Sequence, residues 1–336
     1  MIEVSAGIIR RGDGRILVCQ RGEGRRNAHL WEFPGGKREA GETAADCLRR
    51  ELLEELSLPV TEVRSVCERE AQGIHFTFLE GFAEAEPVRT EHEALRFVRP
   101  REMLGLPFCP ADEAVARWLA LRHPPLTAFF WDYDGTLADS YPALTRTFVR
   151  AAAGVGVSVS AERAIGLLKH SLPHAIARLC AETGVDEARF TAVFRAEERR
   201  ITPDDIPLMP GIRETFDALS GDGARHFLVT HNTRGVLEVL GRHGLRDRFT
   251  GWVTREDGYP RKPDPAMLLA LMERHGVRPG EGVMIGDRPL DMEAGKNAGL
   301  VTCLLDPDGR FPETPCDLRA ADAHGLAALL RPPFPG

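Results

Sequence analysis

The chain has 336 residues, of which 43% are hydrophobic and 28% are charged, and its formal net charge is −7. This length exceeds what one core usually organises and the composition is that of globular proteins, so we expect two folded domains and no disordered or fibrous character. The mild negative charge is spread evenly along the chain, which argues against duplex nucleic acid as a partner, because such a partner needs a basic surface.

The first third of the chain alternates strand patterns with one strong helix pattern. The helix is predicted over residues 43–57, and a second amphipathic helix is predicted over 109–122. The predicted strands cover residues 4–11, 15–20, 61–70, 74–84 and 94–98. This is a mixed α+β arrangement. The chain runs from Met-Ile-Glu-Val directly into a strand pattern, without a leader or a long apolar run, so we expect no signal peptide, no membrane span and a cytoplasmic location.

The helix predicted over 43–57 carries three carboxylates on one face. Glu51, Glu54 and Glu55 stand at i, i+3 and i+4, and clustered like charges are costly. A divalent cation such as Mg²⁺ or Mn²⁺, which prefers oxygen ligands, removes that cost. Arg50 lies four residues before Glu54 and can hold a carboxylate in place. The alternative is a solvated acidic helix face without a metal.

These residues belong to a segment that resembles the Nudix box, a motif made of Gly36, five residues, Glu42, seven residues, Arg50-Glu51, an apolar residue and Glu54-Glu55. The resemblance covers about residues 1–122 and implies a Nudix fold. It makes Glu51, Glu54, Glu55 and the Gly35 carbonyl ligands of a divalent metal, with Glu54 helping to activate water. Ser57 stands where the family usually has glycine. Because that glycine leaves the helix in a left-handed turn, serine costs up to ~1 kcal/mol there.

The preceding segment, Trp31-Glu32-Phe33-Pro34-Gly35-Gly36, is similar to the MutT branch of that family. Members of this branch hydrolyse nucleoside triphosphates to a monophosphate and pyrophosphate. Local alignment implies that Arg21 contacts a phosphate, that Glu91 lies near the metals and that Asp112 faces the base. The alternatives are that Arg21 is a surface residue, that Glu91 is a strand-end charge and that Asp112 is the N-cap of its helix.

His123-Pro124-Pro125 is the predicted linker between a first domain, residues 1–122, and a second domain, residues 126–330. In the second domain strand and helix patterns alternate, which predicts an α/β fold with a parallel sheet and helices on both faces. Residues 141–207 have helical periodicity without a strand pattern. Such an insert early in a βα fold is interpreted as a cap over the site.

Polar residues follow three of the predicted parallel strands in the second domain. Asp132 and Asp134 follow the first, Thr230 follows another, and Asp287 with Asp291 follows a third. Because ligands bind outside the carboxyl ends of parallel strands, we expect these side chains to converge, and Lys262 adds a cation. One carboxylate can then accept a phosphoryl group and another can move protons, while magnesium and lysine neutralise charge. Any single Asp could instead be a turn residue.

In this order the motifs resemble the haloacid dehalogenase superfamily, in its phosphoglycolate-phosphatase-like branch, over about residues 126–330. The resemblance implies a Rossmann-like α/β fold with a helical cap. It implies that Asp132 is nucleophile and metal ligand, and that Asp134 is general acid/base within the same metal site. The remaining implied roles are phosphate binding by Thr230 and Lys262, magnesium binding by Asp287 and Asp291, and contact with the substrate by Asn232.

The favoured hypothesis is a bifunctional hydrolase that uses Mg²⁺, or Mn²⁺, in both domains and acts on nucleotides and small phosphorylated metabolites. The first domain would cleave a nucleoside triphosphate, including an oxidised one, and the second would dephosphorylate a product such as the released nucleotide. In one alternative the second domain acts on an unrelated ester such as phosphoglycolate, or on pyrophosphate. In another, one domain is a non-catalytic sensor. The intact carboxylate sets argue against the sensor.

Overall fold

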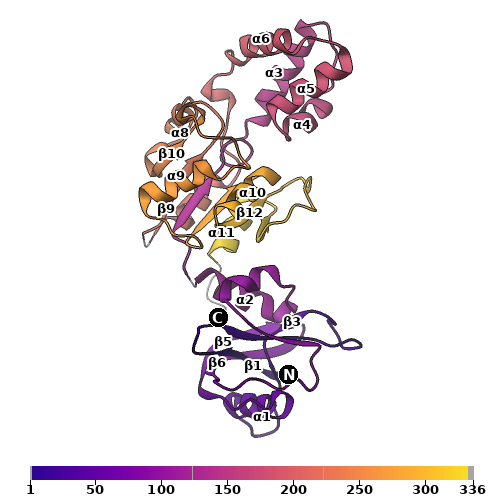
Figure 1. The fold of residues 1–336 in the computed structure, drawn as a ribbon, viewed down its shortest axis with the longest axis vertical. Coiled ribbons are helices and arrows are strands. Elements are labelled where there is room, and N and C mark those ends of the chain that lie inside the picture. Colours follow the sequence, from indigo (N-terminus) through magenta and orange to yellow (C-terminus); the bar gives the residue numbers. More distant parts are fainter. Residues whose placement is uncertain (1, 123, 222, 332–336) are drawn as a thin grey trace. The chain divides into compact units, whose positions relative to one another are not determined.

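The computed structural model describes residues 2–122, 124–221 and 223–331. Met1 of the predicted first domain and His123 of the predicted linker lie outside the described residues. The chain divides into two compact units, one built mainly from residues 1–125 and the other from residues 126–329 (Figure 1). Each unit has its own sheet and its own core. In the described part of the chain, no helix has both the length and the apolar character needed to cross a bilayer.

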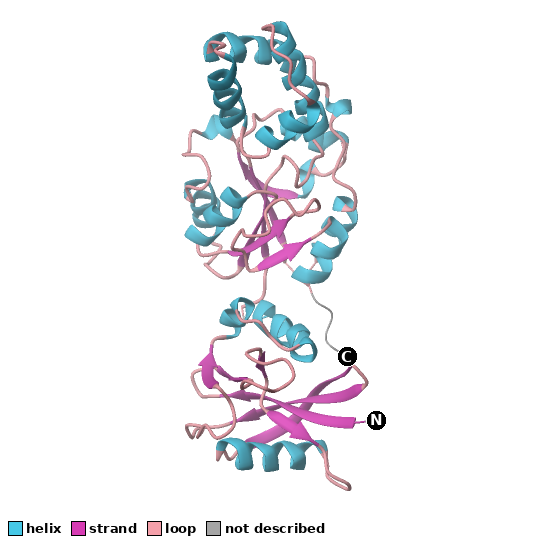
Figure 2. Ribbon diagram, turned by 90° about the vertical axis from the view of Figure 1, so that its right-hand side faces the viewer, coloured by secondary structure: helices cyan, strands magenta, loops and turns pink. Residues whose placement is uncertain are grey.

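The first unit is a mixed sheet with a helix on each side (Figure 2). Its central strands run in the order β3-β2-β1-β6-β5, with β4 paired to β1 and β7 to β2. The strands are β1 (Ile2–Arg10), β2 (Ile16–Gln20), β3 (Trp31–Glu32), β4 (Gly35–Lys37), β5 (Thr61–Ala71), β6 (Ile74–Phe82) and β7 (Ala94–Val98). The helices are α1 (Ala44–Leu56), η1 (Pro100–Gly105) and α2 (Pro110–Arg122). The predicted α+β class is confirmed.

Alternation along the strands divides the core of this unit into two layers. Ile8 and Val18 pack in the cluster that includes the α2 residues Val115 and Leu119. Their neighbours Ile9, Leu17 and Cys19 pack on the other face, with the α1 residues Leu48, Leu52 and Leu56. Because successive side chains of a strand point to opposite faces, both faces of β1 and β2 are apolar and covered.

Helix α1 begins and ends as its sequence predicts. The Thr43 hydroxyl accepts a hydrogen bond from the Asp46 amide at 3.1 Å and is the N-cap. At the other end Ser57 adopts φ 49° and ψ 34°, the left-handed conformation, and its amide donates to the Leu53 carbonyl. The serine thus takes the conformation that glycine adopts more easily.

The second unit contains a six-stranded parallel sheet in the order β10-β9-β8-β11-β12-β13. The predicted α/β class is confirmed. The strands are β8 (Ala128–Trp131), β9 (Arg225–Val229), β10 (Phe249–Val253), β11 (Gly282–Gly286), β12 (Val301–Leu305) and β13 (Leu318–Ala320). The surrounding helices are α7 (Ile212–Leu219), α8 (Val236–Arg242), α9 (Ala266–His275), α10 (Pro289–Asn297) and α11 (Ala323–Leu330), with short turns η3 (Arg246–Arg248) and η4 (Arg255–Asp257).

Between β8 and α7 the chain forms a separate group of helices, called the cap below (Figure 1). These are α3 (Tyr141–Gly154), α4 (Ala161–Leu168), α5 (Leu172–Thr183) and α6 (Glu187–Glu198), followed by η2 (Pro203–Asp205). Phe148, Phe190 and Phe194 are fully buried among these helices. The cap therefore has an apolar core of its own.

Candidate functional sites

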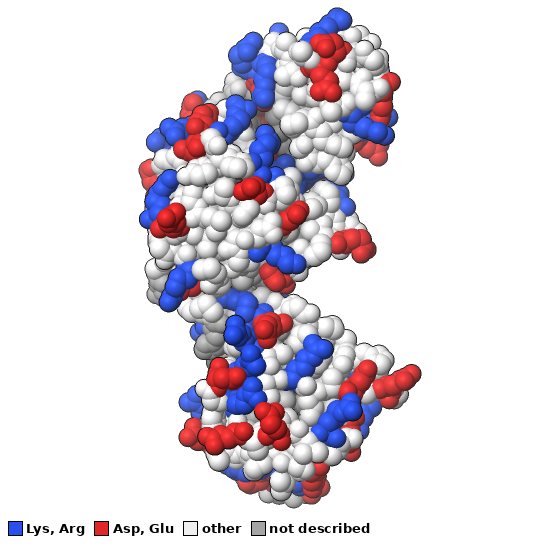
Figure 3. Space-filling view, in the orientation of Figure 1, with Lys and Arg blue, Asp and Glu red and all other residues white. Residues whose placement is uncertain are grey.

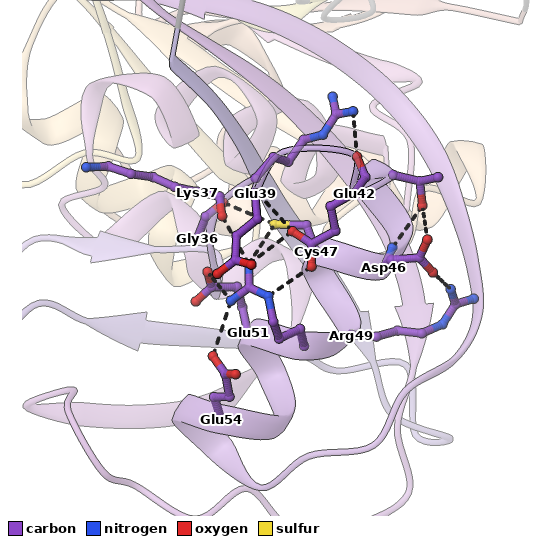
Figure 4. Close-up of polar contacts among 12 residues, drawn as sticks. Gly36, Lys37, Glu39, Glu42, Asp46, Cys47, Arg49, Glu51 and Glu54 are labelled. Carbon is purple, nitrogen blue, oxygen red and sulfur yellow. Dashed lines mark hydrogen bonds and ion pairs between the residues drawn. The ribbon is translucent and has the colours of Figure 1, made fainter.

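In the first unit, Arg50 pairs with carboxylates from the loop before α1 and from the helix itself. Figure 4 shows these carboxylates, Glu42, Glu51 and Glu54. Its guanidinium donates to Glu42 at 2.9 Å, to Glu51 at 2.9 Å and to Glu54 at 3.2 Å. The hydrogen bond from Arg50 is the main cause that lowers the pKa of Glu42 to about 2. Arg50 thus fixes the loop to the acidic face of α1, and the predicted contact with Glu54 is confirmed.

The glycine-rich strand β4 lies directly against the acidic face of α1. A Cβ atom built on Gly36 would lie 2.2 Å from the carboxyl carbon of Glu51. Any side chain at this position would displace that carboxylate. Gly35, the predicted carbonyl ligand, is also in β4, where it pairs with Ala6 of β1. Glycine at position 36 thus lets the backbone approach the Glu51 carboxylate closely.

Four polar side chains, Glu55, His92, Glu32 and Arg21, lie in sequential contact. The sequence did not predict this arrangement. His92 Nε2 lies 3.9 Å from Glu55 and 3.7 Å from Glu32, and Glu32 pairs with Arg21 at 2.5 Å. The His92 side chain is only 7% exposed. Glu91, the predicted outlying carboxylate, is instead half exposed and pairs with Arg25. Its charge nevertheless reaches Glu55.

The acidic set of α1 suits a divalent cation by its chemistry. Burial, and then the charges of Glu51 and Glu91, raise the pKa of Glu55, whereas His92 acts in the opposite direction. A bound cation would relieve this crowding of carboxylates. Within residues 2–122, however, no three acidic side chains bring their oxygens within 4.8 Å of one another. Glu51 and Glu54 are held by Arg50, and Glu55 lies beside His92.

Arg21 and Asp112 line one pocket with Asn27 and Phe76. Asp112 is the third residue of α2, not its N-cap, because the helix begins at Pro110. The N-cap alternative is therefore wrong. The Asp112 carboxylate instead accepts a hydrogen bond from the Phe33 amide at 3.1 Å. Burial, reinforced by the charge of Glu32, raises the pKa of Asp112 to about 8.

Because of this raised pKa, we expect Asp112→Asn to increase the stability of the first unit relative to wild type, and the difference to grow as the pH rises. The folded pKa of about 8 exceeds the ordinary value of 3.8, so the folded state holds this proton more tightly and loses stability as the pH rises from about 4 to about 8. The amide cannot ionise. Between pH 5 and pH 8.5 the advantage of the variant should grow by about 2–4 kcal/mol.

The measurement is hydrogen-exchange protection of β1 and β6 in the full-length protein, which reports on this unit alone. Wild type and Asp112→Asn are compared at several pH values, with exposed Glu84→Gln as the control. Parallel pH profiles for wild type and Asp112→Asn would show that Asp112 has an ordinary pKa.

In the second unit, three buried aspartates meet at the carboxyl ends of β8 and β11. Oxygens of Asp132, Asp287 and Asp291 all lie within 4.8 Å of one another. The Lys262 ammonium lies 2.6 Å from Asp132 and 2.6 Å from Asp291. A Cβ on Gly135 would lie 2.4 Å from Asp287, and this glycine has φ +74°. Three hard oxygen donors in one buried place fit a magnesium ion.

Lys262 and Asp132 stabilise each other's charge, whereas burial and then the charge of Asp132 raise the pKa of Asp291 to about 6. Burial opposes ionisation of Lys262, but Asp132 and Asp291 outweigh it and the pKa of Lys262 is raised. Burial likewise opposes ionisation of Asp132, yet Lys262 and Arg288 lower its pKa. Asp132 is thus an ionised carboxylate with a cation at hydrogen-bonding distance. This is the state that a carboxylate nucleophile needs.

Asp134 belongs to a neighbouring position with different partners. Its carboxylate accepts from the Ser140 hydroxyl at 2.6 Å and from the Asn232 amide at 3.3 Å, and it lines the cleft between the cap and the sheet. Burial, and then the charge of Asp132, raise the pKa of Asp134 to about 6. The carboxylate of Asp134 is outside the three-aspartate group. Thr230 is buried, and its hydroxyl accepts a hydrogen bond from the backbone amide of Asn232.

Two cations at this site were not predicted. Arg288 lies 3.4 Å from Asp132 and 3.6 Å from Asp287, and Lys169 of the cap lies 2.8 Å from Asp287. Arg288 directly follows Asp287 in the sequence, so its position near the aspartates could have been predicted. Lys169 is far away in sequence and only the folded cap brings it to the cluster.

Both units thus place carboxylates beside cations, as in metal-dependent enzymes that cleave phosphate bonds. The chain belongs to two families: its residues 1–121 match the NUDIX domain and its residues 126–299 match the haloacid dehalogenase-like hydrolases. It is an enzyme that joins a Nudix pyrophosphohydrolase domain to a haloacid-dehalogenase-type phosphatase domain.

Particular relatives match each unit separately. A CTP pyrophosphohydrolase of Escherichia coli is 40% identical over 132 residues, which are 36% of this chain and 94% of that protein. A phosphoglycolate phosphatase of Vibrio vulnificus is 32% identical over 183 residues, which are 51% of this chain and 80% of that protein. The fold of the second unit is shared with a haloacid dehalogenase-like hydrolase of Streptococcus pneumoniae, with a TM-score of 0.52, 19% identity and coverage of 60% and 97% of the two chains.

Proposed function

We propose that the Nudix unit hydrolyses a nucleoside triphosphate to a monophosphate and pyrophosphate, with CTP as the first candidate. The observation that supports this is the pocket that joins Arg21 to the buried Asp112. Arg21 would then bind a phosphate and Asp112 would contact the base. The similarity to a CTP pyrophosphohydrolase supports the choice of CTP. Glu51, Glu54 and Glu55, with the Gly35 carbonyl, would hold the metal, and Glu54 would help to activate water.

The phosphatase unit removes a phosphoryl group through Asp132. The observation that carries this proposal is the ionised, buried Asp132 with Lys262 at 2.6 Å. An Asp132 oxygen forms a bond to phosphorus, the bond from phosphorus to the leaving oxygen breaks, and Asp134 donates a proton to that oxygen. Water then attacks phosphorus and gives its proton to Asp134, and orthophosphate leaves Asp132. Asp132, Asp287 and Asp291 would hold a magnesium ion, which would supply positive charge that stabilises the transferring phosphoryl group.

The remaining residues position the phosphate. Lys262 and Thr230 bind its oxygens, and Asn232 donates to Asp134, which holds that carboxylate toward the cleft. Arg288 adds positive charge from the other side of Asp132. These contacts place the phosphoryl group between nucleophile and acid, which is where orientation accelerates the reaction.

The two activities are sequential if a product of the first unit is a substrate of the second. The candidates are the nucleoside monophosphate and pyrophosphate, since both carry a terminal phosphoryl group. Joining two enzymes in one chain adds little once products diffuse freely, so no kinetic channelling follows.

The test is product analysis of CTP with magnesium and the full-length protein, with and without Asp132→Asn. We expect the variant to stop at CMP and pyrophosphate. With wild type, cytidine identifies CMP as the intermediate, whereas orthophosphate with accumulating CMP identifies pyrophosphate. If wild type and variant give the same products, the sequential proposal is wrong and the second unit serves a separate metabolite.

A further inference from the structure

The cleft between the cap and the sheet is lined by an excess of guanidinium groups. Asp134 stands at its inner end, and its walls include Arg195, Arg255, Arg261 and Arg288. Only one other acidic side chain, Glu198, lines it. Figure 3 shows Lys and Arg side chains gathered where the cap meets the sheet domain on the face drawn. The substrate of the phosphatase unit therefore enters a positively charged space.

Two of these arginines are already neutralised. Arg288 lies against Asp132 and Asp287, and Arg195 pairs with Glu198 one turn along its own helix. Arg255 and Arg261, by contrast, form no ion pair with any carboxylate of the described chain within 4.0 Å, although both are exposed to the cleft. Their positive charges are available to a ligand.

The backbone places both arginines beside the phosphoryl-transfer residues. Arg261 immediately precedes Lys262, whose ammonium contacts Asp132. Arg255 follows the end of β10, and its amide donates to the Asn232 carbonyl at 3.0 Å. Two different loops thus bring Arg255 and Arg261 into the cleft that Asp134 also lines.

These like charges disfavour one another. Burial, and then the charges of Arg288 and Arg255, lower the pKa of Arg261 from its ordinary value. An anion placed between Arg255 and Arg261 would remove this repulsion and accept several hydrogen bonds from the guanidiniums. A neutral leaving group would leave both cations without a partner.

We propose that Arg255 and Arg261 form a subsite for a second anionic group, a carboxylate or a phosphate, on the substrate of the phosphatase unit. This rests on the proposed function, in which Asp132 accepts the phosphoryl group. Of the two products of the Nudix reaction, pyrophosphate carries the second anion on its leaving group. A nucleoside monophosphate does not, because its leaving group is a neutral nucleoside.

The experiment compares substrates with and without that second charge, and the loss in each variant is taken relative to wild type on the same substrate, so that intrinsic differences in reactivity cancel. The pairs are 2-phosphoglycolate against 2-hydroxyethyl phosphate, and pyrophosphate against methyl phosphate. Values of kcat/KM are measured at fixed magnesium and ionic strength for full-length wild type, Arg255→Gln, Arg261→Gln and Asp132→Asn. Exposed Arg274→Gln, on the outer side of α9, is the matched control. Arg261→Lys tests whether charge alone suffices.

Wild type should prefer the anionic member of at least one pair, and the pair shows whether the second group is carboxylate or phosphate. Each glutamine variant should lose kcat/KM on that member about 10-fold more than on its neutral partner. Arg261→Lys should retain more activity than Arg261→Gln. Equal losses on both members, preference for the neutral esters, or turnover of none of the four would overturn the subsite. Undiminished turnover by Asp132→Asn would instead overturn the proposed function.

Discussion

Asp132→Asn should abolish the phosphatase activity and leave hydrolysis of nucleoside triphosphates at the wild-type rate. The amide has the shape of the carboxylate but is no nucleophile, so kcat on phosphate esters should fall by at least about 1,000-fold. Lys262 keeps its contact with Asp291 at 2.6 Å, so the buried cation retains a partner and the unit should still fold. The two activities are measured on the same preparation.

Binding separates a chemical defect from a structural one. The Asp132→Asn variant should still bind a phosphate ester, measured calorimetrically in magnesium, and should keep the wild-type unfolding profile. A folded variant that turns over esters at more than a small fraction of the wild-type rate would show that another group attacks phosphorus. Loss of both activities in a folded variant would show that the units do not work independently.

Glu54→Gln and Glu55→Gln should each lower the rate of triphosphate hydrolysis by about 100-fold or more, because each variant loses a metal ligand. The phosphatase activity should be unchanged, since that unit has its own carboxylates and core. Glu84→Gln, an exposed change in the same unit, is the control. The dependence of the residual rate on Mg²⁺ and Mn²⁺ concentration is the decisive measurement.

The two glutamates have different surroundings, yet one metal titration tests both variants. Glu54 is 61% exposed and bound only by Arg50, whereas Glu55 is 20% exposed beside His92. Saturating metal should therefore rescue part of a binding defect in either variant, but no metal concentration should restore an activity that needs the carboxylate itself. Wild-type rates for both variants at low metal would remove these glutamates from the metal site.

The sequence predicted those parts of the fold that have a long periodic pattern or a strong motif. The helix α1 and the spacing of Glu51, Glu54 and Glu55 are local, so residue order alone reveals them. Strands β3 and β4 escaped prediction because two or three residues carry no readable alternation. The convergence of Asp132, Asp287 and Asp291 was predictable because carboxyl ends of parallel strands share one edge.

Contacts between segments that are distant in the sequence could not be predicted from it. Nothing local shows that Lys169 reaches Asp287, or that His92 lies between Glu32 and Glu55. Asp112 was ambiguous for the same reason: its partner, the Phe33 amide, comes from another element. The local sequence shows which residues are acidic and which helix or strand carries them. The tertiary fold decides which cations neutralise them.

The contact between Lys169 of the cap and Asp287 has a consequence for the end of the catalytic cycle. Any movement of the cap away from the sheet would take the positive charge of Lys169 from the aspartate cluster and make the cluster less attractive to an anion. By thermodynamic reciprocity, the closed cap strengthens binding of phosphate to the same extent that bound phosphate stabilises the closed cap. Orthophosphate would thus favour the conformation that retains it, so its departure and an opening of the cap would be energetically coupled.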